Sequence, residues 1–144
     1  MVNPGSAEFQ HDDMEHIRKD AKILCVCWHG STRSKYIARA LDEMGYPNAH
    51  VLSVMQLKKN QTASESSIRE HDLVVCASDT EYYEIRYFLK THGIDDLHKV
   101  LNLHLGQDIH ARLHVSLFEG GHRAEDDVSK SIEELKTSLS AVGF

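Results

Sequence analysis

The stretch from Ile23 to Met44, ILCVCWHGSTRSKYIARALDEM, constrains the fold most strongly, because three local patterns follow one another within it. Its first four residues are apolar or β-branched, as in a short strand that is buried on both faces. A polar loop follows, and Ser34 after it is a candidate cap for the first turn of a helix. The apolar residues of that helix have the i, i+4, i+7 spacing of one face: Ile37, Leu41 and Met44.

The loop in this stretch is suited to hold a tetrahedral anion. A loop that enters a helix turns free backbone N–H groups inward, where they and the helix dipole favour a phosphate-like dianion. Gly30 lets the backbone curl, and Arg33 can donate two hydrogen bonds to two phosphate oxygens. The predicted phosphate-binding residues are Trp28, His29, Gly30, Ser31, Thr32 and Arg33.

Cys27 ends the predicted strand directly before this loop. The positive field of the loop is expected to favour its thiolate form, and a thiolate beneath a bound phosphoryl group is an attacking nucleophile. The hydroxyl of Ser34 would stabilise the sulfur and later the departing thiolate. The alternative is structural: Cys25 and Cys27 are small core residues, and Arg33 is a solvated charge at a helix start.

The segment resembles the signature of cysteine-dependent protein tyrosine phosphatases, which is a cysteine, five residues, an arginine and then serine or threonine. Its place directly after the first strand is similar to low-molecular-weight tyrosine phosphatases and related arsenate reductases. The loop itself departs from that pattern. Low-molecular-weight enzymes usually have glycine, asparagine and a second cysteine where this chain has His29, Gly30 and Thr32, and glycine at the third place resembles the dual-specificity enzymes.

The resemblance also implies a general acid that protonates the departing phenolate. In low-molecular-weight phosphatases this acid is an aspartate followed by proline, in a loop before the last helix. The prolines of this chain are Pro4 and Pro47, and Ser116 falls where that aspartate would lie. We favour Asp108 as the acid because it follows the fourth predicted strand, with Glu119 or no acid at all as alternatives.

Two further residues carry weaker expectations. Ser53 stands where low-molecular-weight phosphatases have a serine that hydrogen-bonds the phosphate loop, although it could equally be an ordinary strand residue. Cys76 is expected in the core, and a regulatory disulfide with Cys27 is the alternative.

The rest of the chain alternates strands and helices. Further strands are expected at 50–54, 72–76 and 99–105, helices at 79–92 and from 126 or 127 onward, and a loop with a short helix at 57–69. This order predicts an α/β fold: a small doubly wound parallel four-stranded sheet with helices on both faces and the phosphate loop between the first strand and first helix. Residues 1–20 are expected to be a tag-like or flexible leader, and 21–144 a single phosphatase-like domain.

The composition of the chain argues against several classes of binding partner and cofactor. The chain has 144 residues and a formal charge of −6, which argues against nucleic-acid and membrane-surface binding. It has no apolar run of membrane-spanning length, and its three cysteines favour thiol chemistry in the cytoplasm over a disulfide framework. Its 11 histidines lack recognisable zinc-ligand spacing, so no metal and no other cofactor is expected.

The sequence therefore predicts a cysteine-dependent phosphatase that hydrolyses phosphotyrosine or another aryl phosphate through a thiophosphoryl-cysteine intermediate. Its catalytic residues would be Cys27, Arg33, Ser34 and Asp108. Its partners would be a phosphorylated protein or a small aryl phosphate, with inorganic phosphate as product. Three alternatives stay open: a non-catalytic phosphate-loop binding module, a phosphocysteine carrier resembling the IIB domains of sugar phosphotransferase systems, and an arsenate reductase.

Overall fold

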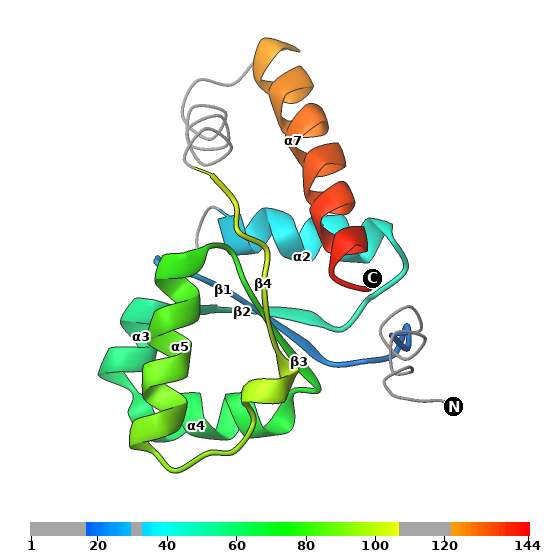
Figure 1. The fold of residues 1–144 in the computed structure, drawn as a ribbon. Coiled ribbons are helices and arrows are strands. Elements are labelled where there is room, and N and C mark those ends of the chain that lie inside the picture. Colours follow the sequence, from blue (N-terminus) through cyan, green and yellow to red (C-terminus); the bar gives the residue numbers. More distant parts are fainter. Residues whose placement is uncertain (1–16, 30–32, 107–121) are drawn as a thin grey trace.

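A computed structural model describes residues 17–29, 33–106 and 122–144, with the backbone alone for 122–127. Its strands are β1 (Ile23–Cys27), β2 (Ala49–Ser53), β3 (Leu73–Cys76) and β4 (Val100–Asn102). Its helices are α2 (Arg33–Glu43), α3 (Val54–Lys59), α4 (Gln61–Glu70), α5 (Asp79–Thr91) and α7 (His122–Ala141), with a 3-10 turn η1 (Leu97–Lys99) before β4 (Figure 1).

The four strands form one parallel sheet in the order β2-β1-β3-β4. β2 pairs with one edge of β1, and β3, the next strand in sequence, pairs with the opposite edge of β1. This reversal places a topological switch point between β1 and β3, where parallel α/β sheets bind their ligands at the carboxyl ends of the strands. The predicted α/β class, with parallel strands and crossover helices, is confirmed.

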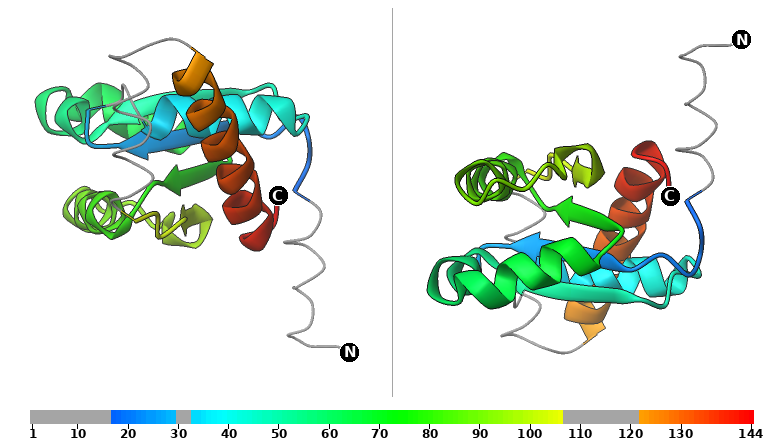
Figure 2. Two further views of the ribbon diagram at one scale, coloured as in Figure 1. Left: turned by 90° about the horizontal axis from the view of Figure 1, so that it is seen from above. Right: turned by 90° about the horizontal axis from the view of Figure 1, so that it is seen from below.

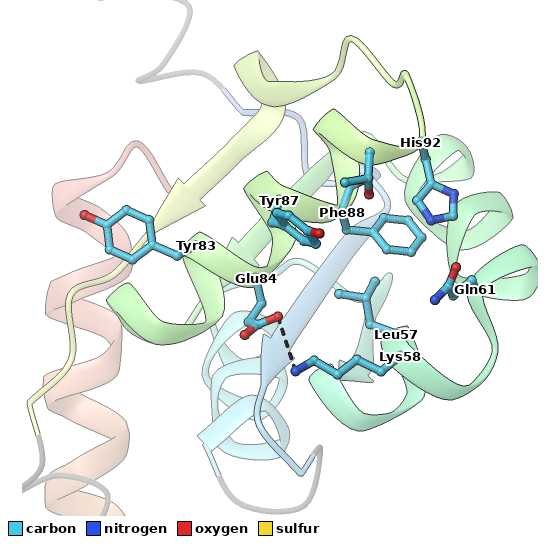
Figure 3. Close-up of a pocket in the computed structure, with 9 residues that line it drawn as sticks. Leu57, Lys58, Gln61, Tyr83, Glu84, Tyr87, Phe88 and His92 are labelled. Atoms are coloured by element: carbon cyan, nitrogen blue, oxygen red, sulfur yellow. Dashed lines mark hydrogen bonds and ion pairs between the residues drawn. The ribbon is translucent and has the colours of Figure 1, made fainter.

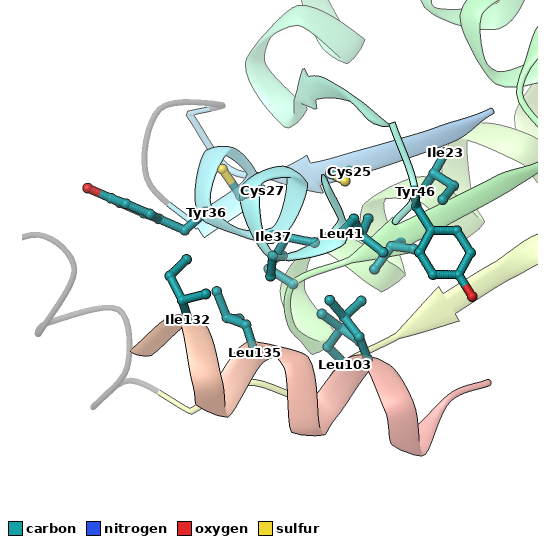
Figure 4. Packing of buried hydrophobic residues seen from close by; sticks show 14 of the residues in the cluster. Ile23, Cys25, Cys27, Tyr36, Ile37, Leu41, Tyr46, Leu103, Ile132 and Leu135 are labelled. Atoms are coloured by element: carbon teal, nitrogen blue, oxygen red, sulfur yellow. The ribbon is translucent and has the colours of Figure 1, made fainter. Parts of the chain in front are cut away.

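Helices cover both faces of the sheet (Figures 1 and 2). On one face α2 and α7 pack over alternate residues of β1, and Figure 4 shows Cys25 and Cys27 there with Ile37, Leu41 and Leu135. On the other face α3, α4 and α5 pack over the remaining β1 residues, Leu24 and Val26. All five β1 residues are buried, as expected for a central strand between two helix layers.

Several element boundaries differ from the prediction for local reasons. α2 begins at Arg33, so Ser34 lies inside the first turn and is not its cap. The polar stretch predicted as loop plus short helix forms two helices, α3 and α4. β4 ends at Asn102, because His104 has a left-handed backbone with φ of 53° that interrupts the extended chain. α2 and α5 stop at the predicted glycines, Gly45 and Gly93, both with positive φ.

Residues 17–20, which the sequence analysis assigned to the leader, contact the domain. Ile17 packs against the α2–α7 side of the core, and the Tyr46 hydroxyl donates to its carbonyl. The Lys19 ammonium donates to the Met44 carbonyl and lies over the Tyr46 ring. Residues 1–16 lie outside the described part of the chain. None of the described helices has the length and apolar character needed to cross a membrane.

Candidate functional site

Cys27 lies at the carboxyl end of β1, at the predicted strand-to-helix junction. Its side chain is 3% exposed, and its Sγ is 3.0 Å from the Oγ of Ser34, within hydrogen-bond distance. Ser34 is fully buried in the first turn of α2. The sulfur therefore contacts the helix turn at which the positive end of the α2 dipole is located. The predicted pairing of this thiol with the serine hydroxyl is present.

Arg33 is the first residue of α2, and its guanidinium reaches across to the start of α5. Its Nη1 donates to the Oγ of Ser78 over 3.2 Å, and its Nη2 donates to Oε2 of Glu81 over 3.1 Å. Its Nε is buried and has no hydrogen-bond partner among the described residues. A buried donor without a partner is costly, so this N–H is a free position for an acceptor such as a phosphate oxygen.

Glu81 holds the arginine in this orientation. Its side chain is 1% exposed, and its Oε1 accepts hydrogen bonds from both the backbone N–H and the hydroxyl of Ser78. Its Oε2 accepts from Arg33, so each carboxylate oxygen of this buried charge is satisfied. Ser78 and Glu81 were not predicted as site residues from the sequence. The S-x-x-E spacing of residues 78–81 is the signature of a helix-capping box and was the available signal.

Trp28 and His29, two of the predicted phosphate-binding residues, directly follow β1 in the chain and contact Met55 of α3. The Trp28 carbonyl accepts from the Met55 N–H over 3.3 Å, and its ring packs against the α3–α5 side of the core below the Lys58 ammonium. The imidazole Nδ1 of exposed His29 is 3.2 Å from the Met55 Sδ. The other predicted loop residues, Gly30, Ser31 and Thr32, lie outside the described residues, as do Asp108, Ser116 and Glu119.

Ser53 has a structural role in the described part of the chain. It pairs in register with Cys27 across the sheet, and its hydroxyl accepts the Gln56 N–H as the N-cap of α3. A cap of this kind accounts for a serine at the end of β2. A contact between Ser53 and residues 30–32 would fall outside the described residues.

The other two cysteines belong to the core. Cys25 lies on the Cys27 face of the sheet and Cys76 on the opposite face, so the alternative of a Cys27–Cys76 disulfide is wrong. Burial raises the pKa of both thiols, with smaller contributions from Cys27 for Cys25 and from Glu81 for Cys76. All three cysteines lie in the described part of the chain, and none forms a disulfide.

Two pockets in the described part of the chain differ in their relation to the predicted site. A groove of about 490 Å³ lies between α3, α4 and α5, lined in part by Leu57, Tyr87 and Phe88, with Lys58 and Glu84 paired at 3.6 Å (Figure 3). It contains none of the predicted site residues. A smaller polar pocket of about 220 Å³ lies at the carboxyl ends of β3 and β4 and includes Ser78, the hydroxyl partner of Arg33. The smaller pocket is therefore the one next to the predicted chemistry.

Among residues 17–29, 33–106 and 128–144, no group of three or more histidine, cysteine, aspartate or glutamate side chains is placed to hold a metal ion. No protein-family model matches this chain, and neither a curated protein nor a solved structure matches it. The resemblance to tyrosine phosphatases thus depends on the Cys27–Arg33–Ser34 signature itself and on its place in the fold.

Proposed function

We propose that this protein is a cysteine-dependent phosphatase acting on phosphotyrosine or another aryl phosphate. The observation that supports this most directly is the arrangement around the switch point. Cys27 and Ser34 are in contact at the carboxyl end of β1, and the neighbouring residue Arg33 has a buried Nε–H with no hydrogen-bond partner in the described part of the chain. Attack on a phosphoryl group requires a nucleophile and a cationic donor that can act on the same group.

In the proposed reaction the Cys27 thiolate attacks phosphorus and the bond to the aryl oxygen breaks, giving a thiophosphoryl-cysteine. Water then attacks that phosphorus, the sulfur–phosphorus bond breaks, and inorganic phosphate leaves. The Nε–H of Arg33 and the positive end of the α2 dipole would stabilise negative charge that develops on the phosphoryl oxygens. The hydroxyl of Ser34 would hydrogen-bond the sulfur when it leaves as a thiolate. This chemistry requires no metal ion in the reaction.

The Arg33–Glu81 pair has a positioning role in this proposal. Two terminal nitrogens of the guanidinium are fixed by Ser78 and Glu81, so the Nε edge is the one presented to the ligand. Glu81 compensates part of the arginine charge, which leaves more of the work of anion binding to backbone N–H groups and the helix dipole. A thiolate nucleophile also requires a reducing environment, so the cytoplasm is the proposed location.

The test compares Cys27→Ser with Cys25→Ser, a matched change two residues earlier on the same strand and the same face. We expect Cys27→Ser to lower the turnover of p-nitrophenyl phosphate by on the order of 10⁶-fold, the loss seen when a covalent enzyme loses its nucleophile. It should keep its affinity for inorganic phosphate. Cys25→Ser should keep its turnover once both variants are shown by circular dichroism to be folded.

Three outcomes would argue for other functions. Equal turnover by wild type and Cys27→Ser would exclude the cysteine mechanism. A stable phosphocysteine detected by mass spectrometry, without release of phosphate, would indicate the carrier. Phosphate binding without turnover by wild type would indicate a binding module, which the burial of Cys27 also allows.

A further inference from the structure

A second polar cluster occupies the carboxyl edge of the sheet, beyond the residues predicted from the sequence. Asp79 is the first residue of α5, Asn102 is the last residue of β4, and His104 follows two residues later. Oδ1 of Asp79 accepts a hydrogen bond from the Asn102 amide over 2.9 Å and lies 2.8 Å from Nδ1 of His104. An aspartate that holds one imidazole nitrogen leaves the other nitrogen available for proton transfer.

The backbone at His104 is shaped to hold this arrangement. Its φ of 53° is the one positive value at a non-glycine residue among the described residues. The side-chain oxygen of Asn102 accepts the His104 N–H over 2.8 Å, so Asn102 supports both the turn and Asp79. A non-glycine residue persists in the left-handed region only when its surroundings fix it there, and such residues gather at functional sites.

The cluster borders the small polar pocket next to Arg33. That pocket is lined by Ser78, Asp79, Thr80, His104, Leu105 and Gly106. The Ala77 N–H donates to the Val26 carbonyl, and the Leu105 N–H donates to the Ala77 carbonyl. The ends of β1, β3 and β4 therefore lie side by side, at the spacing of about 4.8 Å between neighbouring strands. His104 stands two strands from Cys27, with the Arg33 partner Ser78 between them.

We propose that His104 is the general acid for the aryl leaving group, and that Asp79 is the residue that positions it. This inference rests on the proposed phosphatase function and deepens it, because it supplies the proton donor that the sequence motif lacks. The imidazole is 72% exposed at the pocket rim, where a leaving group would reach solvent.

The proton balance uses the two nitrogens separately. Nδ1–H donates to the Asp79 carboxylate throughout. As the thiolate attacks phosphorus, Nε2–H of the imidazolium gives its proton to the departing aryl oxygen, and the phosphorus–oxygen bond breaks. The neutral imidazole then takes a proton from the water that attacks the thiophosphoryl group. Phosphate and the Cys27 thiolate leave, and the imidazolium is restored, so no other reactant is needed.

Asp79 is suited to this role because it stays ionised. Its pKa is held below the ordinary value, first by the Asn102 amide and then by the His104 imidazole. Among the residues lining the pocket, Asp79 and His104 are the two with ionisable side chains. The nearby Arg33–Glu81 pair lies beyond Ser78 and is charge-compensated. An ionised carboxylate can only accept hydrogen bonds, so Asp79 keeps Nδ1 of His104 as a donor and leaves Nε2 for proton transfer.

The test replaces His104 with asparagine, a residue that tolerates left-handed backbone, so His104→Asn removes the imidazole while keeping the turn. We expect kcat for phenyl phosphate, a poor leaving group, to fall by about 10²-fold or more. The loss for p-nitrophenyl phosphate should be much smaller, since its leaving group needs little protonation. Asp79→Asn should lower kcat for phenyl phosphate more than kcat for p-nitrophenyl phosphate, with little change in KM for either.

The controls separate this inference from its alternatives. His98→Asn, which changes an exposed histidine in η1, should leave both substrates unaffected. If His104→Asn loses equal activity toward both substrates, or none, His104 is not the acid. A leaving-group-dependent loss in Asp108→Asn instead would assign that role to Asp108. If wild type shows no turnover of either substrate, the proposed phosphatase function itself fails, and this inference fails with it.

Discussion

Two polar clusters meet at the first turn of α5, and they differ in burial. The Arg33–Glu81 cluster, made of Arg33, Ser78 and Glu81, faces inward, with its charged side chains 11% and 1% exposed. The Asp79–His104 cluster, made of Asp79, Asn102 and His104, faces outward, with the Asp79 and His104 side chains 65% and 72% exposed. Two acidic residues in the first turn of α5 thus lie in different environments: Glu81 is buried and Asp79 is exposed to solvent.

The difference in burial suggests different roles: the buried Arg33–Glu81 cluster holds the site in place, and the exposed Asp79–His104 cluster is accessible for reaction. A buried ion pair is hardly screened, and loss of one partner leaves the other as an uncompensated charge. An exposed pair is screened by water and contributes little to stability. We therefore expect the Arg33–Glu81 cluster to control folding and the orientation of Arg33. The Asp79–His104 cluster should affect stability only weakly, so that its main effect would be on proton transfer.

The largest effect on stability is expected from Glu81→Ala. This change leaves the buried Arg33 guanidinium without its carboxylate and also removes the acceptor for the Ser78 N–H. We expect the free energy of unfolding to fall by about 3–5 kcal/mol, measured by urea denaturation. Glu65→Ala, which removes the contacts of a half-exposed carboxylate with Arg69 and His92, is the control and should cost much less.

A double variant separates the contribution of the Arg33–Glu81 pair to stability from the contribution of Arg33 to phosphate binding. Arg33→Met combined with Glu81→Leu replaces the buried pair by apolar side chains of similar size, which often restores or exceeds the original stability. We expect a folded protein that no longer binds inorganic phosphate. Phosphate affinity equal to that of wild type would show that Arg33 serves only the fold.

The sequence was informative where local pattern decides structure. The apolar runs located all four strands; the central strand β1 is apolar throughout because it is buried on both faces, whereas the edge strand β2 is largely exposed. The end of β1 then located Cys27, and the i, i+4 spacing located α2. Gly45 and Gly93 marked the ends of two helices, since each adopts a left-handed backbone there.

The side-chain partners of the site residues, such as Glu81 for Arg33, were not predicted, because they depend on contacts between strands and helices that are distant in sequence. The S-x-x-E pattern at Ser78 indicates a cap for α5, but the arrival of Arg33 on Glu81 follows from the parallel pairing of β1 with β3. The proposed role of His104 likewise depends on the left-handed turn and on the neighbouring start of α5. The acid proposed from the resemblance, Asp108, lies outside the described residues and stays a prediction.

An intermediate effect is expected from Ser34→Ala. The change removes the hydroxyl that lies 3.0 Å from the Cys27 sulfur in a fully buried position. Stability should fall by about 0.5–1.5 kcal/mol, the net value of a typical hydrogen bond. Ser131→Ala is a matched control, because Ser131 is also fully buried but its Oγ has no hydrogen-bond partner among the described residues. That control should be neutral or stabilising, and an equal loss in both variants would assign no stability to the Cys27–Ser34 contact.

The smallest effect concerns the exposed cluster at low pH. The pKa of Asp79 is lowered in the folded state, so its contribution to stability is present above the ordinary value of 3.8 and is lost as pH falls through the folded-state value. Asp79→Asn carries no such titration. The stability of wild type should therefore exceed that of the variant at pH 6, and the two curves should converge below about pH 4. Parallel curves across this range would mean that Asp79 gains nothing from Asn102 and His104, and the exposed cluster would then be no better ordered than an isolated surface carboxylate.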